Sequence, residues 1–263
     1  MTPNIDTDQA SSLQREYYRE TAQDYDAMHP RDEHLAALQH VARFLRAIGA
    51  KSVLDTGCGT GLAMRTLQAA LPDVLIHGND PSQPLLDIAS RRFGIDPARL
   101  DCASSERLPY GDGEFDAVVE TGKLHHVAAP EKVIAEMLRV ARLGVFISDD
   151  NFFGSGRLYA RVGKFVLART GLLGYVYRLR RGGHEWLYSP VDGVAWSYSV
   201  FDSTPQLAAA GAQVLVLPTS PPGSWAAQAA PLLFASHCLV VALKGSGVDA
   251  LTSTNHAAPA GIN

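Results

Sequence analysis

The sequence is short of cysteine, of net positive charge and of long apolar runs. Its three cysteines, Cys58, Cys102 and Cys238, lie far apart and lack the paired spacing of a redox or zinc motif. The 263 residues carry a net charge of -4, so no overall positive field attracts nucleic acid. Arginines interrupt the longest apolar stretches before they reach the roughly 18 residues that span a membrane. These absences predict a soluble, cytoplasmic protein without a nucleic-acid partner.

Apolar segments of strand length alternate with helical patterns along most of the chain. We expect strands at 52–55, 74–79, 99–103, 115–119 and 145–148, and helices at 33–48, 62–70, 84–93 and 130–140. Strands that alternate with helices form βαβ units, which build a parallel sheet covered by helices on both faces. Residues 213–217 and 236–243 add a closing antiparallel pair. The sequence therefore predicts an α/β fold with a doubly wound, Rossmann-like, mostly parallel seven-stranded sheet whose last strand is antiparallel.

The stretch KSVLDTGCGTG, which begins at residue 51, places Asp55 and three glycines directly behind the first strand. Gly57, Gly59 and Gly61 permit positive φ and remove the Cβ atoms that would keep a ligand away from the backbone. The loop does not match the dinucleotide-binding fingerprint GxGxxG, because Leu62 occupies the position of the third glycine when the motif is counted from Gly57. A carboxylate at this place also repels a pyrophosphate. The loop therefore favours a cationic ligand.

This loop resembles motif I of the class I S-adenosylmethionine-dependent methyltransferases, and later segments agree with that family in order and distance. IHGNDPS ends the second strand with Asp80, ERLPYGDGEFDAVVETGKLHHV resembles the family's stretch around LPF, FD and LHHV, and VIAEMLRVARLGVFISDDN resembles its RVLKPGG helix and fifth strand. The match covers roughly residues 25–151. The members that it resembles most act on small molecules, including quinones and natural products.

The resemblance implies an S-adenosylmethionine site at the carboxyl edge of the sheet. Asp80 would hold both ribose hydroxyls through its two carboxylate oxygens. Ser104 stands where relatives usually carry an acid that contacts the adenine amino group, which leaves the backbone N–H of Ser105 as an adenine contact. The expected cofactor-binding residues are Tyr25, Asp55, Thr56, Gly57, Cys58, Gly59, Gly61, Asp80, Pro81, Ser104, Ser105, Glu120 and Thr121.

Two histidines follow the fourth strand at the edge where the acceptor would bind. Methyl transfer to a hydroxyl requires removal of its proton, so His125 and His126 are candidates for the base, and His29 is a third. The LHHV motif also occurs in relatives with different acceptors, so a structural role for the pair stays open. A second hypothesis places a magnesium ion on Glu120, Asp150 and Asn151, as in metal-dependent O-methyltransferases. Because Glu120 does not sit at the expected offset, we expect no metal.

Residues 157–181 interrupt the alternation with seven basic and no acidic residues. We expect a helical lid there, whose charge would attract an anionic acceptor or make peripheral contact with an anionic membrane. A solvated helix face is the alternative. The predicted division of the chain is a cap helix over the cofactor (1–32), a cofactor-binding core (33–151), the lid insertion (152–203), the end of the core (204–244) and a disordered tail (245–263).

The predicted function is transfer of a methyl group from S-adenosylmethionine to a small molecule. Oxygen is the favoured acceptor atom, in a natural product, a quinone or phenol, or a lipid-like molecule. One alternative is a protein that binds the cofactor without methylating, such as a natural-product cyclase. Another is an NAD oxidoreductase, which the missing third glycine disfavours. The sequence leaves the acceptor, the base and the oligomeric state open.

Overall fold

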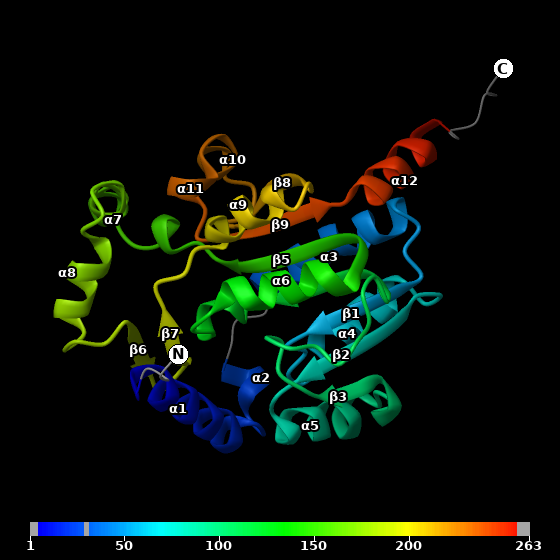
Figure 1. Ribbon diagram of the computed structural model, residues 1–263, viewed down its shortest axis with the longest axis horizontal. Helices are drawn as coiled ribbons and strands as arrows, with labels where there is room; N and C mark the ends of the chain where they lie inside the picture. Colours follow the sequence, from blue (N-terminus) through cyan, green and yellow to red (C-terminus); the bar gives the residue numbers. More distant parts are fainter. Residues whose placement is uncertain (1–4, 29–31, 257–263) are drawn as a thin grey trace.

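The structure is a computed structural model that describes residues 5–28 and 32–256. A seven-stranded sheet with the order β3-β2-β1-β4-β5-β9-β8 crosses the molecule (Figure 1). Its strands are β1 Ser52–Thr56, β2 Leu75–Asp80, β3 Leu100–Cys102, β4 Phe115–Thr121, β5 Ala141–Asp150, β8 Gln213–Ser220 and β9 His237–Leu243. The pairs within β1 to β5 are parallel, whereas β9 is antiparallel to both of its neighbours. The predicted doubly wound sheet with an antiparallel last strand is therefore confirmed.

Helices cover both faces of the sheet, as the alternation of strands and helices predicts. The helices of the core are α3 Asp32–Ala47, α4 Leu62–Ala70, α5 Gln83–Phe93, α6 Pro130–Val140, α9 Thr204–Ala209 and α12 Gly245–His256. Side chains of α3 and α4 share one buried cluster with the sheet, and those of α6 and α9 share the cluster on its other face. In α6, Val133, Met137 and Val140 are buried at spacings of three and four residues, so one apolar stripe faces the strands.

The prediction of a disordered carboxyl-terminal tail is wrong for residues 245–256. Residues 245–263 were expected to be disordered, but residues 245–256 form α12, which packs against α3, β5 and β9. Val248 and Leu251 pack against the main core cluster, and a Cβ on Gly247 would lie 2.2 Å from the carbonyl oxygen of Leu143. The sequence did not predict this helix because its residues are mostly small or polar, and among the described residues Val248, Ala250 and Leu251 are the apolar ones that pack against the core. Residues 257–263 lie outside the described residues.

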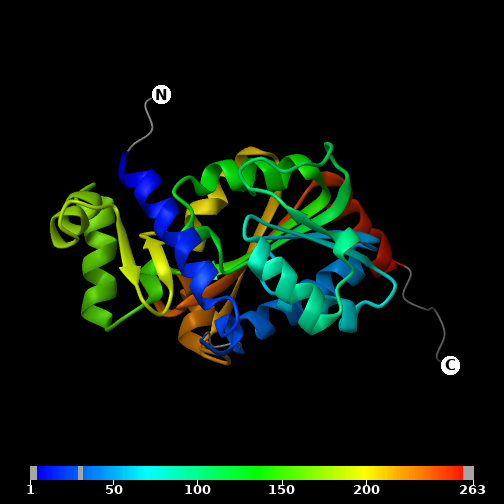
Figure 2. The ribbon, with the colours of Figure 1, turned by 90° about the horizontal axis from the view of Figure 1, so that it is seen from below.

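The amino-terminal helix α1, Ile5–Thr21, crosses from the lid to α5, and the short helix α2, Tyr25–Met28, follows it (Figure 2). Gln14 accepts a hydrogen bond of 2.6 Å from the backbone N–H of Val194, and the hydroxyl of Tyr17 donates one of 2.6 Å to the carbonyl oxygen of Val191. The two backbone groups on the lid, the N–H of Val194 and the carbonyl oxygen of Val191, are 180 and 174 residues away from their partners on α1 in the sequence. The amino-terminal helix thus ties the lid to the core.

The insertion after β5 is only partly helical. It contains the expected helices, α7 Leu158–Arg169 and α8 Leu173–Arg180, and then an antiparallel hairpin that was not predicted, β6 Trp186–Ser189 and β7 Gly193–Trp196. The short helices α10, Trp225–Ala229, and α11, Pro231–Phe234, lie between β8 and β9. In Figure 1, α7 and α8 form the end of the molecule that lies opposite α12. Within the described residues, every helix is too short or too polar to cross a bilayer.

Candidate functional site

The glycine loop leaves β1 at the carboxyl edge of the sheet and leads into α4. Gly57, Gly59 and Gly61 have φ values of 78°, 52° and 82°. A Cβ on Gly61 would lie 2.4 Å from Cδ1 of Ile95, whereas one on Gly59 would meet nothing within 4 Å. Gly61 therefore permits close packing inside the protein. Gly59 leaves open space in front of the loop, which is the property expected of a ligand-binding backbone.

Asp55 lies at the end of β1, directly behind this loop, and is completely buried. Neither of its carboxylate oxygens has a hydrogen-bond partner in the described part of the chain. The backbone amide of Met64 is close enough to lower the pKa of this carboxyl without being aligned for a hydrogen bond. Burial and the neighbouring Asp80 nevertheless raise that pKa to about 7. An uncompensated buried carboxylate of this kind favours a cationic ligand.

Asp80 is the last residue of β2 and lies next to the glycine loop, where its carboxylate accepts hydrogen bonds from two backbone N–H groups. One carboxylate oxygen accepts a hydrogen bond of 3.1 Å from the N–H of Gly59, and the other accepts one of 2.8 Å from the N–H of Ser82. The side chain is buried, and burial raises its pKa. These bonds hold the carboxylate in one orientation at the strand end. Asp80 therefore presents an oriented acceptor group at the place where the sequence predicts ribose recognition.

Lys123 is a site residue that the sequence analysis missed. Its ammonium group contacts the hydroxyl of Ser105, and its aliphatic stem lies against the loop, where a Cβ on Gly57 would be 2.2 Å from its Cδ. Burial lowers the pKa of Lys123, while the negative charges of Asp80, Glu120 and Asp55 act in the opposite direction. Three buried carboxyl groups thus share one lysine. The signal in the sequence was a basic residue placed directly after an acid-bearing strand end.

Ser105 and Thr56 belong to a polar network behind the site. The hydroxyl of Thr56 donates to that of Ser105 at 2.8 Å, and the side-chain amide of Asn79 donates to the carbonyl oxygen of Ala103 at 3.1 Å. Glu120 is buried at the end of β4 and accepts a hydrogen bond of 2.5 Å from the backbone N–H of Lys123. These contacts position the loop that carries Lys123. The side chains of Thr56, Ser105 and Glu120 therefore support the site from behind.

Two cavities meet at this edge of the sheet. A cavity of about 130 Å³ is lined by the glycine loop, by Tyr25 and Thr121, and by both histidines. A second cavity, of about 560 Å³, is lined by Pro81, Ser104 and Lys123, together with side chains of α1. His126 borders both cavities. One elongated ligand that contacted both the glycine loop and the end of β2 would therefore lie along Lys123.

His125 forms a hydrogen-bonded pair with a buried aspartate. Its Nδ1 lies 2.6 Å from Oδ1 of Asp149, whose other carboxylate oxygen accepts the backbone N–H of Leu124 at 2.7 Å. Burial opposes ionisation of both groups, but the charge of Asp149 outweighs it and raises the pKa of His125 to about 10. The same attraction lowers the pKa of Asp149 to about 2. Because Nδ1 is engaged by Asp149, Nε2 is the remaining ring nitrogen of His125, a residue that lines the smaller cavity.

His126 is oriented by a backbone carbonyl on the lid. Its Nδ1 lies 2.6 Å from the carbonyl oxygen of Val194, and burial together with the charge of His125 lowers its pKa to about 4. Asp192, in the turn of the lid hairpin, places its carboxylate oxygens 3.8 Å from Nε2 of His125 and 3.7 Å from Nε2 of His126. Among the described residues, His125, His126 and Asp192 form the group whose ligand atoms lie close enough together to hold a metal ion.

The residues of the magnesium hypothesis have other partners. The side-chain amide of Asn151 donates to the carbonyl oxygens of Pro231, Leu232 and Ala235 at 3.1, 2.8 and 2.7 Å. Its oxygen accepts from the backbone of Phe153 and from the hydroxyl of Ser199. These hydrogen bonds connect α11 to the end of β5. They occupy both the nitrogen and the oxygen of the amide, so the oxygen is not available as a metal ligand. The structure therefore does not assemble Glu120, Asp150 and Asn151 into a metal centre.

Most of the predicted site residues lie at one edge of the sheet. Those that line one of the two cavities are Tyr25, Gly57, Cys58, Gly59, Pro81, Ser104, Thr121, His125 and His126. Those that lie buried behind them are Asp55, Thr56, Asp80, Ser105 and Glu120. His29, the third candidate base, lies outside the described residues. The sequence analysis missed Lys123, Asp149 and Asp192.

The strand order and the acid-bearing glycine loop define the fold of class I methyltransferases. Residues 53–144 match a family model described as a methyltransferase domain. Residues 53–144 therefore form a methyltransferase domain, and the resemblance seen in the sequence is confirmed.

Several curated proteins are similar to part of this chain. The ubiquinone/menaquinone biosynthesis C-methyltransferase of Desulfotalea psychrophila is 31% identical over 96 residues, which are 36% of this chain and 39% of that protein. The ubiquinone biosynthesis O-methyltransferase of Hahella chejuensis is 31% identical over 156 residues, which are 57% of this chain and 62% of that protein. The chain spans from 33% to 62% of the length of the curated relatives that it matches.

Solved structures share the fold over nearly the whole chain. Magnesium protoporphyrin IX methyltransferase from Synechocystis, with bound S-adenosylhomocysteine, aligns with a TM-score of 0.59 and 18% identity over 90% of this chain and 100% of its own. A didemethyltoxoflavin N-methyltransferase from Burkholderia thailandensis aligns with a TM-score of 0.56 and 16% identity over 93% of this chain and 92% of its own. At these identities, the likeness establishes the fold.

Proposed function

We propose that this protein transfers a methyl group from S-adenosylmethionine to a small molecule, with oxygen as the acceptor atom. One observation carries the proposal: three buried carboxyl groups, those of Asp55, Asp80 and Glu120, surround a bare glycine loop and share the charge of a single lysine. A site with that balance favours a ligand that brings its own positive charge. The family match, and the cofactor or its product bound in structural neighbours, support this choice of cofactor.

The residues present fit this cofactor. The two carboxylate oxygens of Asp55, which have no hydrogen-bond partner among residues 5–28 and 32–256, match an ammonium group. Asp80 is already oriented by the N–H groups of Gly59 and Ser82, and its carboxylate matches a pair of ribose hydroxyls. When bound, the cofactor supplies an electrophilic methyl group on a sulfonium. The contribution of the protein is then to align the acceptor with that methyl group and to exclude water.

The pair formed by His125 and Asp149 supports oxygen as the acceptor atom. A hydroxyl becomes a sufficient nucleophile only as it loses its proton, and a positioned imidazole can take that proton. Asp149 holds Nδ1 of His125, so that Nε2 is the nitrogen available to the acceptor. Asp149 also stabilises the imidazolium, so His125 becomes available as a base only as the pH rises toward its pKa of about 10. His126 lies beside His125 and would contact the acceptor from the larger cavity.

The acceptor that we propose is a phenol, a quinone-like natural product or a lipid-like molecule. The similarity to quinone methyltransferases supports this class. A cofactor-binding protein that does not methylate is the competing function. Calorimetric titration with S-adenosylmethionine, S-adenosylhomocysteine and NAD, followed by assays for S-adenosylhomocysteine release with a panel of hydroxylated aromatics, separates the two. Binding without turnover of any compound would favour the competing function.

The affinity for S-adenosylmethionine is expected to fall as the pH is lowered below 7. Burial raises the pKa of Asp55 to about 7, and the ammonium group of the ligand binds the ionised carboxylate. Binding must therefore displace a proton from Asp55 at lower pH, and the affinity should approach a loss of about tenfold per pH unit. The α-amino group of the ligand, with a pKa of about 8, stays protonated in this range. Calorimetry in buffers of different ionisation enthalpy measures the released proton directly.

An Asp55→Asn variant should lose both this pH dependence and most of the affinity. Asp73→Asn is the matched control, because Asp73 is exposed in the turn before β2. If Asp55→Asn bound the cofactor as tightly as the unmodified chain at pH 7.5, Asp55 would have no part in cofactor binding.

A further inference from the structure

The lid carries an unusual concentration of exposed apolar side chains. Of the thirteen large apolar residues that are exposed in the described part of the chain, ten lie between residues 158 and 191. Six of them lie on the two lid helices or directly before the second, at spacings of three and four residues within each group: Tyr159, Val162, Val166, and then Leu172, Tyr175 and Leu179. We call these six the lid stripe. Each helix thus turns one apolar face toward solvent.

The lid stripe is not a consequence of loosely packed helices. Their other faces hold aromatic contacts, with the ring of Phe165 6.5 Å from that of Phe153 and the ring of Tyr177 5.3 Å from that of Phe152. Lys164 donates a hydrogen bond of 2.9 Å to the carbonyl oxygen of Ser155. The inner faces are therefore occupied, and the apolar residues of the lid stripe are additional. Exposed apolar surface of this extent usually marks an interaction site.

The charge around the lid stripe selects the kind of partner. Residues 157–181 contain seven basic and no acidic residues, in a chain whose net charge is -4. Arg169 and Arg180 are exposed at the ends of α7 and α8, and neither side chain has a hydrogen bond or an ion pair with another described residue. Two copies of this surface would repel each other. An apolar stripe flanked by arginines matches a lipid surface with anionic headgroups.

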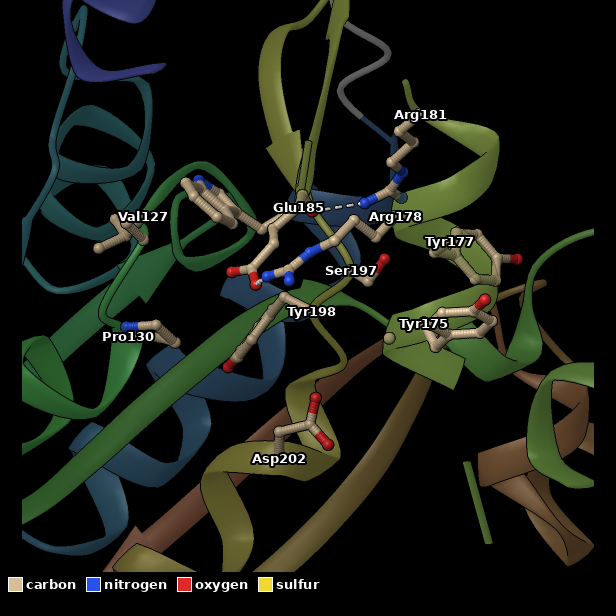
Figure 3. A pocket seen from close by; sticks show the side chains of 13 residues that line it. Val127, Pro130, Tyr175, Tyr177, Arg178, Arg181, Glu185, Ser197, Tyr198 and Asp202 are labelled. Carbon is tan, nitrogen blue, oxygen red and sulfur yellow. Dashed lines mark hydrogen bonds and ion pairs between the residues drawn. The ribbon is translucent and has the colours of Figure 1, made fainter. Parts of the chain in front are cut away.

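The lid stripe is also continuous with a cavity. A pocket of about 570 Å³ lies between α8 and the core. Figure 3 shows Tyr175, Tyr177 and Arg178 on its lid side and Val127 and Pro130 on its core side. Tyr175 belongs both to the lid stripe and to the wall of this pocket. Val127 directly follows His126 in the chain. A molecule that leaves a lipid surface under α8 would therefore enter a cavity whose core wall adjoins the candidate active site.

We propose that the lid stripe docks on an anionic lipid surface and that the methyl acceptor is an amphiphile taken from that surface. The second half of this inference rests on the function proposed above, whereas the first half does not. Docking would place α7 and α8 flat on the headgroups, with the stripe inserted and Arg169 and Arg180 at the level of the phosphates. The acceptor would reach the active site without crossing water.

Vesicle flotation with the full chain tests the docking. Neutral phosphatidylcholine vesicles are compared with vesicles that contain about 30% phosphatidylglycerol at low salt. We expect binding to the anionic vesicles only, and its loss as salt is raised. Arg169→Glu with Arg180→Glu should lower the partition coefficient about 25-fold or more, at about fivefold for each charge removed. Val162→Asp with Val166→Asp should lower it at least about tenfold.

The matched control is Leu75→Asp, because Leu75 is exposed at the start of β2 and lies outside the lid. It should float like the unmodified chain. Equal binding to neutral and anionic vesicles, or no effect of either double variant, would overturn the proposal. So would displacement of the bound protein by an oligonucleotide, which would identify a nucleic-acid partner. S-adenosylmethionine titration of every variant reports separately on the proposed function, since no lid stripe residue lies in the cofactor site.

Discussion

Replacing His125 by asparagine is expected to lower kcat by about 10²–10⁴-fold while leaving the affinity for S-adenosylmethionine unchanged. The reason is that Nδ1 of His125 is held 2.6 Å from Asp149, which leaves Nε2 as the nitrogen that can take the proton of the acceptor. Asparagine retains a polar group but has no basic nitrogen. The measurement is the rate of S-adenosylhomocysteine formation at saturating cofactor, with an acceptor identified from the panel described above.

The pH dependence of kcat/KM in a second variant, Asp149→Asn, shows whether His125 acts as a base or has only a structural role. Asp149 stabilises the protonated form of His125 and raises its pKa to about 10, so in the unmodified enzyme the neutral base forms only as the pH rises toward that value. Without the negative charge, the pKa of His125 should fall toward the ordinary histidine value of about 6.5. The rise of kcat/KM with pH should therefore move to lower pH in Asp149→Asn. A purely structural pair would change the rate without moving this midpoint.

His40→Asn is the matched control, since His40 lies on α3 and lines none of the cavities of the candidate site. It should have the kcat of the unmodified enzyme. Thermal unfolding checks that each variant is folded. A His125→Asn variant with unchanged kcat would exclude His125 as the base. Addition of a chelator tests whether an ion on His125, His126 and Asp192 contributes, because the unmodified enzyme should keep its rate.

Those parts of the site that lie within a few residues of a strand end could be predicted from the sequence. Asp55, Gly59 and Asp80 follow short apolar strands, and parallel strands carry such residues to a common edge. The alternation of strands and helices predicts a parallel sheet, whereas the rule for right-handed crossovers is compatible with more than one strand order. The family resemblance added the identity of the expected ligand, S-adenosylmethionine, to an arrangement that the periodicity already predicts.

The positions of Asp149 and Asp192 could not be predicted, because they depend on the exact end of a strand and on a contact between distant segments. The predicted fifth strand ended at residue 148, but β5 continues to Asp150, so Asp149 rather than its neighbours reaches His125. Strand residues alternate between faces, and an error of one residue exchanges the side chain that faces the site. Asp192 comes to the histidines only because the lid hairpin folds back against α1. No local pattern identifies such a contact.

Replacing Lys123 by methionine is expected to destabilise the protein without ligand by about 3–5 kcal/mol. Methionine keeps the stem that lies against Gly57 but leaves the buried carboxyl groups of Asp55, Asp80 and Glu120 without their nearest cation. For a chain of this size the loss corresponds to a decrease in Tm of about 10 °C. Differential scanning fluorimetry measures it. Lys132→Met, a change at an exposed lysine of α6, is the matched control and should unfold at the original temperature.

The same variant should respond more strongly to a cationic cofactor than the unmodified protein does. S-adenosylmethionine carries a sulfonium that S-adenosylhomocysteine lacks, so only the former brings a second positive charge to the unbalanced carboxylates. We expect the rise in Tm caused by S-adenosylmethionine to be larger in Lys123→Met than in the unmodified chain, and the rise caused by S-adenosylhomocysteine to increase less. Equal shifts with both ligands would mean that the carboxyl groups protonate when the lysine is removed. In that case the site recognises the shape of the nucleoside and gains nothing from its charge.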